Sequence, residues 1–147
     1  MKFATIEPAE SRLTWVEGKE PWEFYPSLGL PCDGGVDHGV VIPWHMMLSR
    51  IGIAIIVDQF SLFVPPEDQR YFVIGRQLYA GNAILYGYNE EGITVDLPMM
   101  PVIVFITRAG IEEAIQAGQI DRPIMAINNE KFWEWPNPSP FPLPEQP

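Results

Sequence analysis

Basic residues are scarce in this sequence. Nine Lys and Arg stand against 19 Asp and Glu among 147 residues, which gives a formal net charge of −10. Such a surface repels phosphate backbones, because nucleic-acid affinity comes largely from Lys and Arg displacing condensed counterions. We therefore expect no direct nucleic-acid binding, whereas the same field speeds encounter with a basic protein partner.

Cysteine and long hydrophobic runs are nearly absent as well. Cys32 is the only cysteine, so no disulfide within the chain is possible. The longest apolar runs, 51–57 and 97–106, fall well short of the roughly 20 residues that cross a bilayer as a helix. The N-terminal residues reach Glu7 and Pro8 before the apolar core of a signal peptide could form. We expect a cytoplasmic protein with no membrane partner.

Phosphate-binding and metal-binding motifs are missing too. The glycine-containing pairs at 34–35 and 81–82 match neither of the common phosphate-cradling patterns. The residues of mixed metal-ligand type, which include no closely spaced ligand pair, are Cys32, Asp33, Asp37, His38 and His45. We expect no metal, no cofactor and no catalytic residue. A Cys32 dyad with His38 or His45 has no supporting motif.

Short apolar segments dominate what is present. Alternating or wholly apolar stretches rich in β-branched residues predict strands at 2–7, 12–16, 39–42, 53–57, 60–64, 71–74, 83–88, 93–97, 102–106 and 124–127. Residues 26–37 carry Pro and Gly breakers and are interpreted as a loop. Residues 44–50 predict two helical turns after Pro43, or else the continuation of one bent strand from Val40.

Two local signals are sharper. The segment Asn89-Glu90-Glu91-Gly92 between two apolar stretches predicts a hairpin, because glycine can take the positive φ that a tight turn needs. Thr107 can cap a helix over 108–117, and Gly118 can end it. The apolar stripe of that helix consists of Ile111, Ala114 and Ile115.

The sequence as a whole predicts an α+β, β-dominated single domain with mostly antiparallel strands and one principal helix near 108–117. The globular domain is expected over 1–135. Proline at every second position from 136 to 144 predicts an extended tail over 136–147. That tail is either disordered, laid along its own domain, or bound to a partner.

Aromatic and acidic residues occur together in two places. Tryptophan is enriched as an anchor in interfaces, and neighbouring carboxylates select cationic partners. The alternative is that these rings close the ends of a β core. The candidate binding residues are Trp15, Glu17, Glu20, Trp22, Glu23, Trp133 and Trp135. For a small-ligand site, the candidate polar groups are Arg76 and Asn82.

Three segments carry a resemblance to a known group of proteins. They are Val57-Asp58-Gln59-Phe60-Ser61-Leu62, Ala80-Gly81-Asn82-Ala83-Ile84-Leu85-Tyr86-Gly87 and Asn89-Glu90-Glu91-Gly92. Over about residues 25–97 the chain resembles a loose family of small uncharacterised accessory proteins of phages and plasmids. That resemblance implies a mobile-element context and binding as the mode of action, and it supplies no catalytic residues. The expected cytoplasm is then that of the host cell.

Our leading hypothesis is a non-enzymatic acidic binding protein, a phage or mobile-element accessory factor. It would dock on and inhibit a basic macromolecular partner, such as a host-defence or nucleic-acid-handling protein. The alternatives are a module that binds or sequesters a small, nucleotide-like ligand, a small hydrolase that uses acids and histidine, and a structural component of a virion. Self-association into a homo-oligomer stays open.

Overall fold

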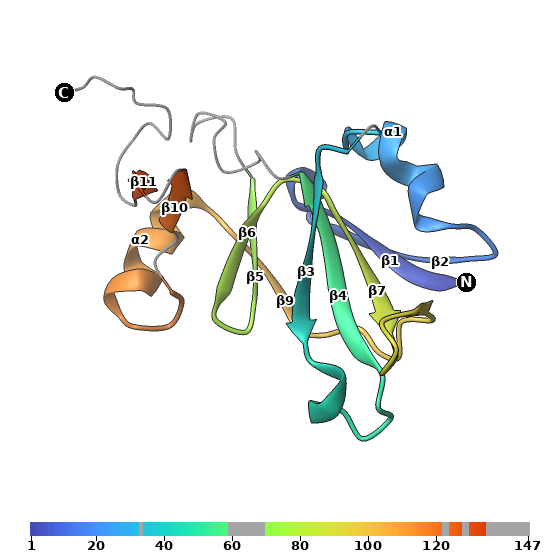
Figure 1. Ribbon diagram of the computed structural model, residues 1–147. Coiled ribbons are helices and arrows are strands. Elements are labelled where there is room, and N and C mark those ends of the chain that lie inside the picture. Colours follow the sequence, from blue (N-terminus) through green and yellow to red (C-terminus); the bar gives the residue numbers. More distant parts are fainter. Residues whose placement is uncertain (33, 59–69, 122–123, 128–129, 135–147) are drawn as a thin grey trace. The chain divides into compact units, whose positions relative to one another are not determined.

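A computed structural model describes residues 1–32, 34–58, 70–121, 124–127 and 130–134. The fold is α+β and β-dominated, as predicted, and every strand pair among the described residues is antiparallel. The chain forms two compact units (Figure 1). Unit 1 comprises Met1–Gln59 and Gly81–Pro101, and unit 2 comprises Phe60–Ala80 and Val102–Pro147.

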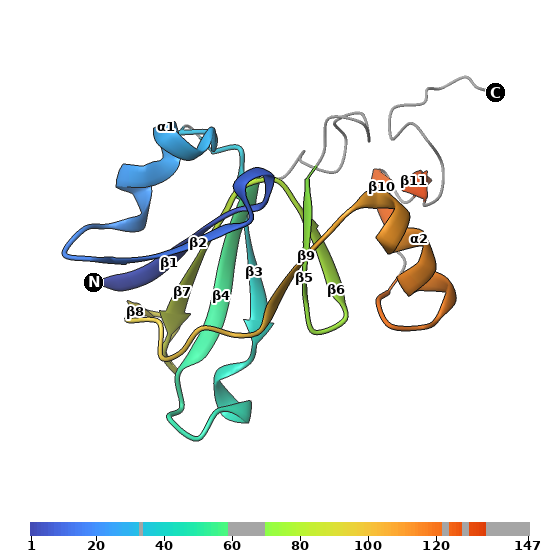
Figure 2. The ribbon, with the colours of Figure 1, turned by 180° about the vertical axis from the view of Figure 1, so that it is seen from behind.

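A six-stranded sheet forms unit 1, with the order β2-β1-β7-β4-β3 and β8 paired to β7 (Figures 1 and 2). Its strands are β1 (Lys2–Glu7), β2 (Arg12–Glu17), β3 (Val36–Ile42), β4 (Gly52–Asp58), β7 (Ala83–Tyr88) and β8 (Thr94–Val95). The interior position of β4 agrees with its apolar sequence, because an interior strand buries side chains on both faces. Ile53 and Ile55 are buried on one face and Ala54 and Ile56 on the other.

One face of this sheet is packed beneath two short helical turns. Side chains alternate along a strand, and the register places Phe3, Val16, Ile56 and Ile84 on that face. They form a buried cluster with Leu28 and Leu30 from the covering segment. That segment contains the 3-10 helix η2 (Pro21–Phe24) and the α-helix α1 (Tyr25–Leu28). The Phe24 ring meets Phe3 edge-on at 5.5 Å between centroids, which anchors the segment on the sheet.

The predicted hairpin joins β7 to β8. The side-chain Oδ1 of Asn89 accepts hydrogen bonds from the backbone N–H groups of Glu91 and Ile93 at 3.0 and 2.9 Å. Gly92 has φ +80°, the left-handed conformation for which the prediction invoked a glycine. The hairpin is therefore confirmed, although its second strand is confined to Thr94–Val95.

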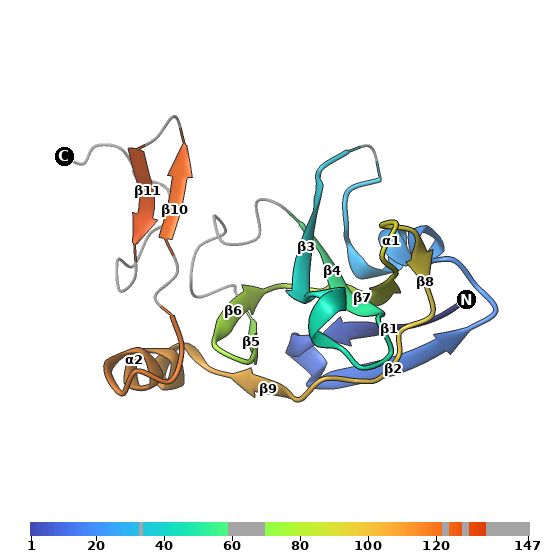
Figure 3. The same cartoon turned by 60° about the horizontal axis from the view of Figure 1, so that its bottom comes forward.

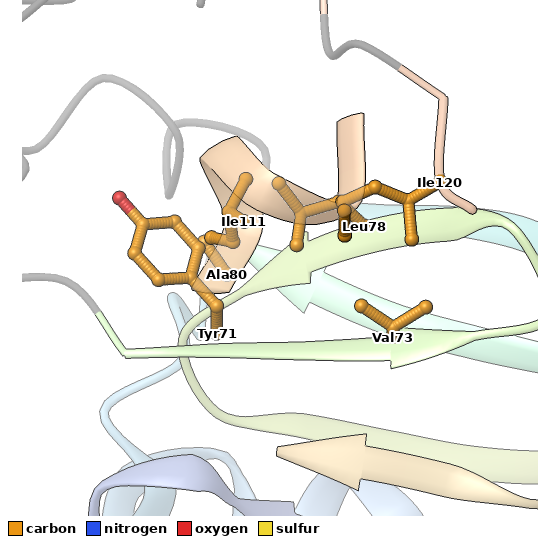
Figure 4. Close-up of a cluster of buried hydrophobic side chains, with 7 residues drawn as sticks. Tyr71, Val73, Leu78, Ala80, Ile111 and Ile120 are labelled. Atoms are coloured by element: carbon orange, nitrogen blue, oxygen red, sulfur yellow. The ribbon is translucent and has the colours of Figure 1, made fainter. Parts of the chain in front are cut away.

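Unit 2 contains a three-stranded sheet of order β6-β5-β9. The strands are β5 (Tyr71–Ile74), β6 (Gln77–Ala80) and β9 (Ile103–Ile106), followed by the helix α2 (Arg108–Gln116). The hydroxyl of Thr107 accepts from the Gly110 N–H at 3.2 Å, and Gly118 follows with φ +74°. Ile111 is fully buried and packs in a cluster with side chains of β5 and β6 (Figure 4). The principal helix, its cap and its buried stripe are confirmed.

A separate antiparallel pair in unit 2 comprises β10 (Ile124–Ile127) and β11 (Glu130–Glu134) (Figure 3). The predicted strand at 60–64 and the predicted tail at 136–147 lie outside the described residues. The expected domain boundary at residue 135 therefore stays a prediction.

Two local interpretations differ from the structure. The expected loop at 26–37 contains α1 and the first residues of β3. The expected helix at 44–50 is one turn of 3-10 helix, η3 (Trp44–Met46). A longer helix is blocked because Met47 is extended and Arg50 has φ +61°. A further 3-10 turn, η1 (Pro8–Glu10), joins β1 to β2.

Candidate functional site

The η2 turn presents an exposed tryptophan between two acidic residues. Pro21 suits the first helical position because its missing N–H would have no partner there. The Glu23 carboxylate accepts from the backbone N–H of Glu20 at 2.8 Å, which ties the start of the turn. Phe24 faces the sheet, whereas the Trp22 side chain is 64% exposed.

Trp22 and Tyr25 line two hollows of unit 1. The smaller, here called the aromatic cavity, has a volume of about 190 Å³ and is lined by Met1, Glu20, Pro21, Trp22, Tyr25, His38, Ile56, Tyr86 and Thr94. The larger, here called the Cys32 hollow, has about 490 Å³ and is lined by Trp22, Glu23, Tyr25, Pro26 and Cys32. Each hollow therefore combines aromatic rings with one carboxylate.

A histidine–tyrosine pair forms part of the wall of the aromatic cavity. His38 comes from the edge strand β3 and Tyr86 from β7, with β4 between them. The Nδ1 atom of His38 lies 3.0 Å from the Tyr86 hydroxyl, and the two rings meet edge-on at 6.1 Å. Burial raises the pKa of Tyr86, and the neighbouring Tyr25 and Tyr88 raise it further. The phenol therefore stays protonated at neutral pH.

Tyr25 has the same property. Burial raises its pKa, with a smaller contribution from Cys32. The tyrosine rings of the aromatic cavity are thus neutral, and their faces carry the negative quadrupole of an aromatic ring. The cavity therefore has the electrostatic character that attracts a cation.

The carboxylates at the two hollows form no ion pair with a described residue. The ion pairs of the described residues include Lys2 with Glu17 at 3.9 Å and Arg12 with Glu7 at 3.0 Å, but none involves Glu20 or Glu23. Neither carboxylate beside Trp22 is therefore neutralised by a direct ion pair.

The structure brings together three of the predicted binding residues and places two others, Trp15 and Glu17, on the opposite face of the sheet. Glu20, Trp22 and Glu23 share the η2 turn. Trp15 pairs with Ala4 on β1, one position out of register with the Phe3–Val16 pair, so it lies on the opposite face of the sheet with Glu17. Trp133 belongs to β11 of unit 2, and its side chain, like all of Trp135, lies outside the described part of the chain.

The two predicted ligand-binding polar groups belong to different units. In unit 2, Arg76 donates from Nε and Nη2 to Oδ1 of Asp121 at 3.2 and 3.0 Å, and from Nη1 to the Gly118 carbonyl at 2.5 Å. In unit 1, Asn82 donates from Nδ2 to the Leu28 carbonyl at 2.9 Å. Both side chains thus bind groups of their own unit, and their role in ligand binding stays a prediction.

The residues considered for metal or nucleophilic chemistry contact different partners. The Cys32 thiol lies 3.8 Å from the Leu30 carbonyl, His38 meets Tyr86, and the His45 ring packs edge-on against Trp44. In the described ranges, no group of three or more His, Cys, Asp or Glu is arranged to hold a metal ion.

Tyr25 and Tyr86 line the aromatic cavity but are not among the candidates from the sequence. The alternation within 83–88 puts Ile84, Tyr86 and Tyr88 on one face, so the strand pattern held a usable signal. What the pattern could not give is the proximity of Tyr86 to η2, which depends on how residues 20–30 cross the sheet.

Comparison with known proteins gives no relative for this chain. No protein-family model, no curated protein and no solved structure matches it. Separately, within the described ranges, no helix is both long enough and apolar enough to cross a membrane. The candidate site therefore has to be interpreted from its own geometry.

Proposed function

We propose that this chain is a non-enzymatic acidic binding protein that docks on a basic macromolecular partner through the surface around Trp22. One observation carries the proposal: an exposed tryptophan lines two hollows, and each hollow has a carboxylate without an ion-pair partner in the described residues. A large aromatic side chain in this setting is the usual anchor of an interface.

The charge of the chain supports the same interpretation. A net charge of −10 steers a positively charged partner toward the surface and raises the association rate at low salt. Glu20 and Glu23 then select for cations close to the anchor. The remaining acidic surface contributes to steering rather than to the strength of the contact.

The partner that we propose follows from the resemblance to accessory proteins of phages and plasmids. In that context the chain acts in the cytoplasm of the host cell, where it covers the basic site of a host-defence or nucleic-acid-handling protein and so inhibits it. Occupation of a basic site by an acidic surface competes directly with nucleic acid, whose affinity rests on the same cations.

The test is affinity capture from cells of the native host, followed by measurement of the captured protein's affinity for purified variants. Trp22→Ala is expected to weaken binding by about 30-fold or more, because truncation of an anchor costs about 2 kcal/mol or more. Trp15→Ala is the matched control, since Trp15 is also a half-exposed tryptophan but lies on the opposite face of the sheet.

Salt dependence provides the second readout. Affinity is expected to fall steadily as sodium chloride rises, because exposed charges are screened within about 8 Å at physiological ionic strength. A partner that binds Trp22→Ala as tightly as the native chain, or whose affinity ignores salt, would refute docking through this surface.

A second candidate function is the binding of a small, nucleotide-like ligand. The volume of the Cys32 hollow, about 490 Å³, falls within the roughly 300–1,000 Å³ of typical ligand pockets, and this favours it. A thermal-shift screen against nucleotides tests it, because a ligand that binds only the folded chain raises the unfolding midpoint. If no nucleotide at about 1 mM raises the midpoint, the chain has no nucleotide site with a dissociation constant well below about 1 mM.

A further inference from the structure

Deepening the proposed function, on which this inference rests, we propose that the aromatic cavity receives the guanidinium group of an arginine side chain from the partner. The aromatic cavity combines three properties that this group requires: flat aromatic walls, a carboxylate at the rim and a small volume.

The aromatic walls provide the first part of the recognition. Trp22, Tyr25 and Tyr86 line the cavity from two elements that are distant in sequence, the covering segment and β7. A cation over such rings gains about 0.5–1 kcal/mol at exposed sites and about 2 kcal/mol when desolvated. The raised pKa values of Tyr25 and Tyr86 keep both rings neutral, so the tyrosines contribute ring faces and hydroxyl oxygens.

The polar groups distinguish arginine from other cations. A guanidinium is planar, stacks on aromatic faces and has five N–H donors, which it can direct to the Glu20 carboxylate and the Tyr86 hydroxyl oxygen. A lysine ammonium is a compact and strongly hydrated charge that does not stack. A quaternary ammonium has no N–H donor and would leave both acceptors unused. Arginine stacks on the ring faces and reaches both acceptors at once, whereas lysine contacts them only as a point charge.

The volume suits a small group. About 190 Å³ is below the roughly 300 Å³ at which drug-sized pockets begin, and it can hold a side-chain head group. The cavity is open to solvent, so the polypeptide that carries such a side chain would extend over the surface beside Trp22.

The experiment uses the full chain, labelled with ¹⁵N, and a blocked glycine peptide with one central arginine. The readout is the indole N–H resonance of Trp22, which is assigned by its absence in Trp22→Phe. Three matched peptides carry citrulline, lysine or trimethyllysine at the same position. Citrulline keeps the shape and loses the charge, so it separates electrostatic recognition from contact area.

The arginine peptide is expected to move the Trp22 resonance saturably with a millimolar dissociation constant. The citrulline peptide should bind at least about tenfold more weakly, and the lysine and trimethyllysine peptides more weakly than arginine. Glu20→Gln should reduce the arginine affinity by about twofold to fivefold, in line with the worth of one solvent-exposed ion pair. Glu113→Gln, at an exposed position of α2 in unit 2, removes the same charge and should change nothing.

Several results would overturn the assignment. A Trp22 resonance that fails to saturate, equal binding of citrulline, or stronger binding of either lysine derivative would each do so. Its failure can be separated from that of the proposed function. A captured partner that binds Glu20→Gln and Tyr25→Leu unchanged supports docking but sinks the arginine pocket. If Trp22 responds to the arginine peptide but Trp22→Ala does not weaken binding to a captured partner, the cavity binds arginine but the proposed docking through Trp22 is wrong.

Discussion

The packed face of the unit 1 sheet permits a quantitative test with one buried and one exposed residue. Ile84 on β7 is fully buried, in a cluster with Phe3, Val16 and Ile56. Val40 on β3 is 59% exposed, although the pairing with Ala54 puts it on the same face. Alanine at each position therefore measures how far the cover supplied by residues 20–30 extends.

The expected costs differ several-fold. Ile84→Ala removes three carbon groups at about 0.8 kcal/mol each, or about 2.4 kcal/mol, and the cavity left behind raises the cost into the range of about 2–5 kcal/mol. Val40→Ala removes two carbon groups of which about two fifths is buried, so the transfer cost is about 0.7 kcal/mol.

Urea unfolding followed by tryptophan fluorescence and far-UV circular dichroism measures both costs, with the slope m checked for constancy. Two probes are needed because the chain forms two compact units, which need not unfold in one transition. If Ile84→Ala costs less than about 1 kcal/mol, or no more than Val40→Ala, the cluster beneath η2 and α1 is not packed as described.

Three further predictions address the helix, the hairpin and the half-buried Tyr86. Thr107→Ala should cost about 1 kcal/mol in urea unfolding and Thr107→Ser much less, because the hydroxyl caps α2 through the Gly110 N–H. Gly87→Ala should cost about 1–3 kcal/mol in the same assay, since a Cβ there would overlap the Asp96 carbonyl oxygen and lie 2.9 Å from the carbonyl carbon. The control Gly39→Ala should be tolerated, because its Cβ would meet only a side-chain carbon of Ile55 at 3.6 Å. Because folding raises the pKa of Tyr86, the stability due to its protonated form is complete below about pH 10 and is lost as pH rises through the folded pKa. The fall of the urea midpoint from about pH 8 to 11 should be shallower in Tyr86→Phe, and an equal fall would contradict the shift.

Much of the fold could be predicted because the deciding interactions are local. The helix near 108–117 is specified by Thr107 before it, Gly118 after it and an apolar stripe between them. The β7–β8 hairpin is specified by Asn89 and Gly92. The short strand β6, at Gln77–Ala80, escaped prediction, and it forms by pairing with β5 across the turn at Gly75.

The sequence did not predict the segments whose conformation depends on tertiary contacts. The segment 44–50 has a proline at its start and no internal breaker before Gly52, yet it forms a single 3-10 turn. The backbone N–H of Trp44 donates to the Tyr88 hydroxyl at 3.2 Å, and Arg50 lies over the Trp44 ring at 4.5 Å and pairs with Glu90. These contacts hold the segment against the β7–β8 hairpin, and no local pattern encodes them.

The candidate site also has one part that the sequence could predict and one part that depends on tertiary contacts. Glu20, Trp22 and Glu23 are neighbours in sequence, so their association could be predicted. His38 and Tyr86 face each other only because β4 lies between their strands in register, with His38 opposite Ile56 and Tyr86 opposite Ala54. Trp15 was grouped with Trp22 because the two are close in the sequence. The alternation of side chains along β2 puts Trp15 on the face of the sheet opposite to η2.

The exposure of Trp22 follows from how its segment is anchored, and this is why it is interpreted as functional. Phe24 and Leu28 are held by the cluster on the sheet, and Pro21 is buried. A shift of the segment by one residue would bury Glu23 in place of Phe24, at a cost of several kcal/mol for an uncompensated charge. The fold thus fixes which side chains face the core. It leaves Trp22, the largest aromatic residue of the segment, in solvent, where its side chain contributes little hydrophobic stabilisation to the fold. The proposed binding to a partner would give a reason to keep it there, because an anchor gains its burial only on association.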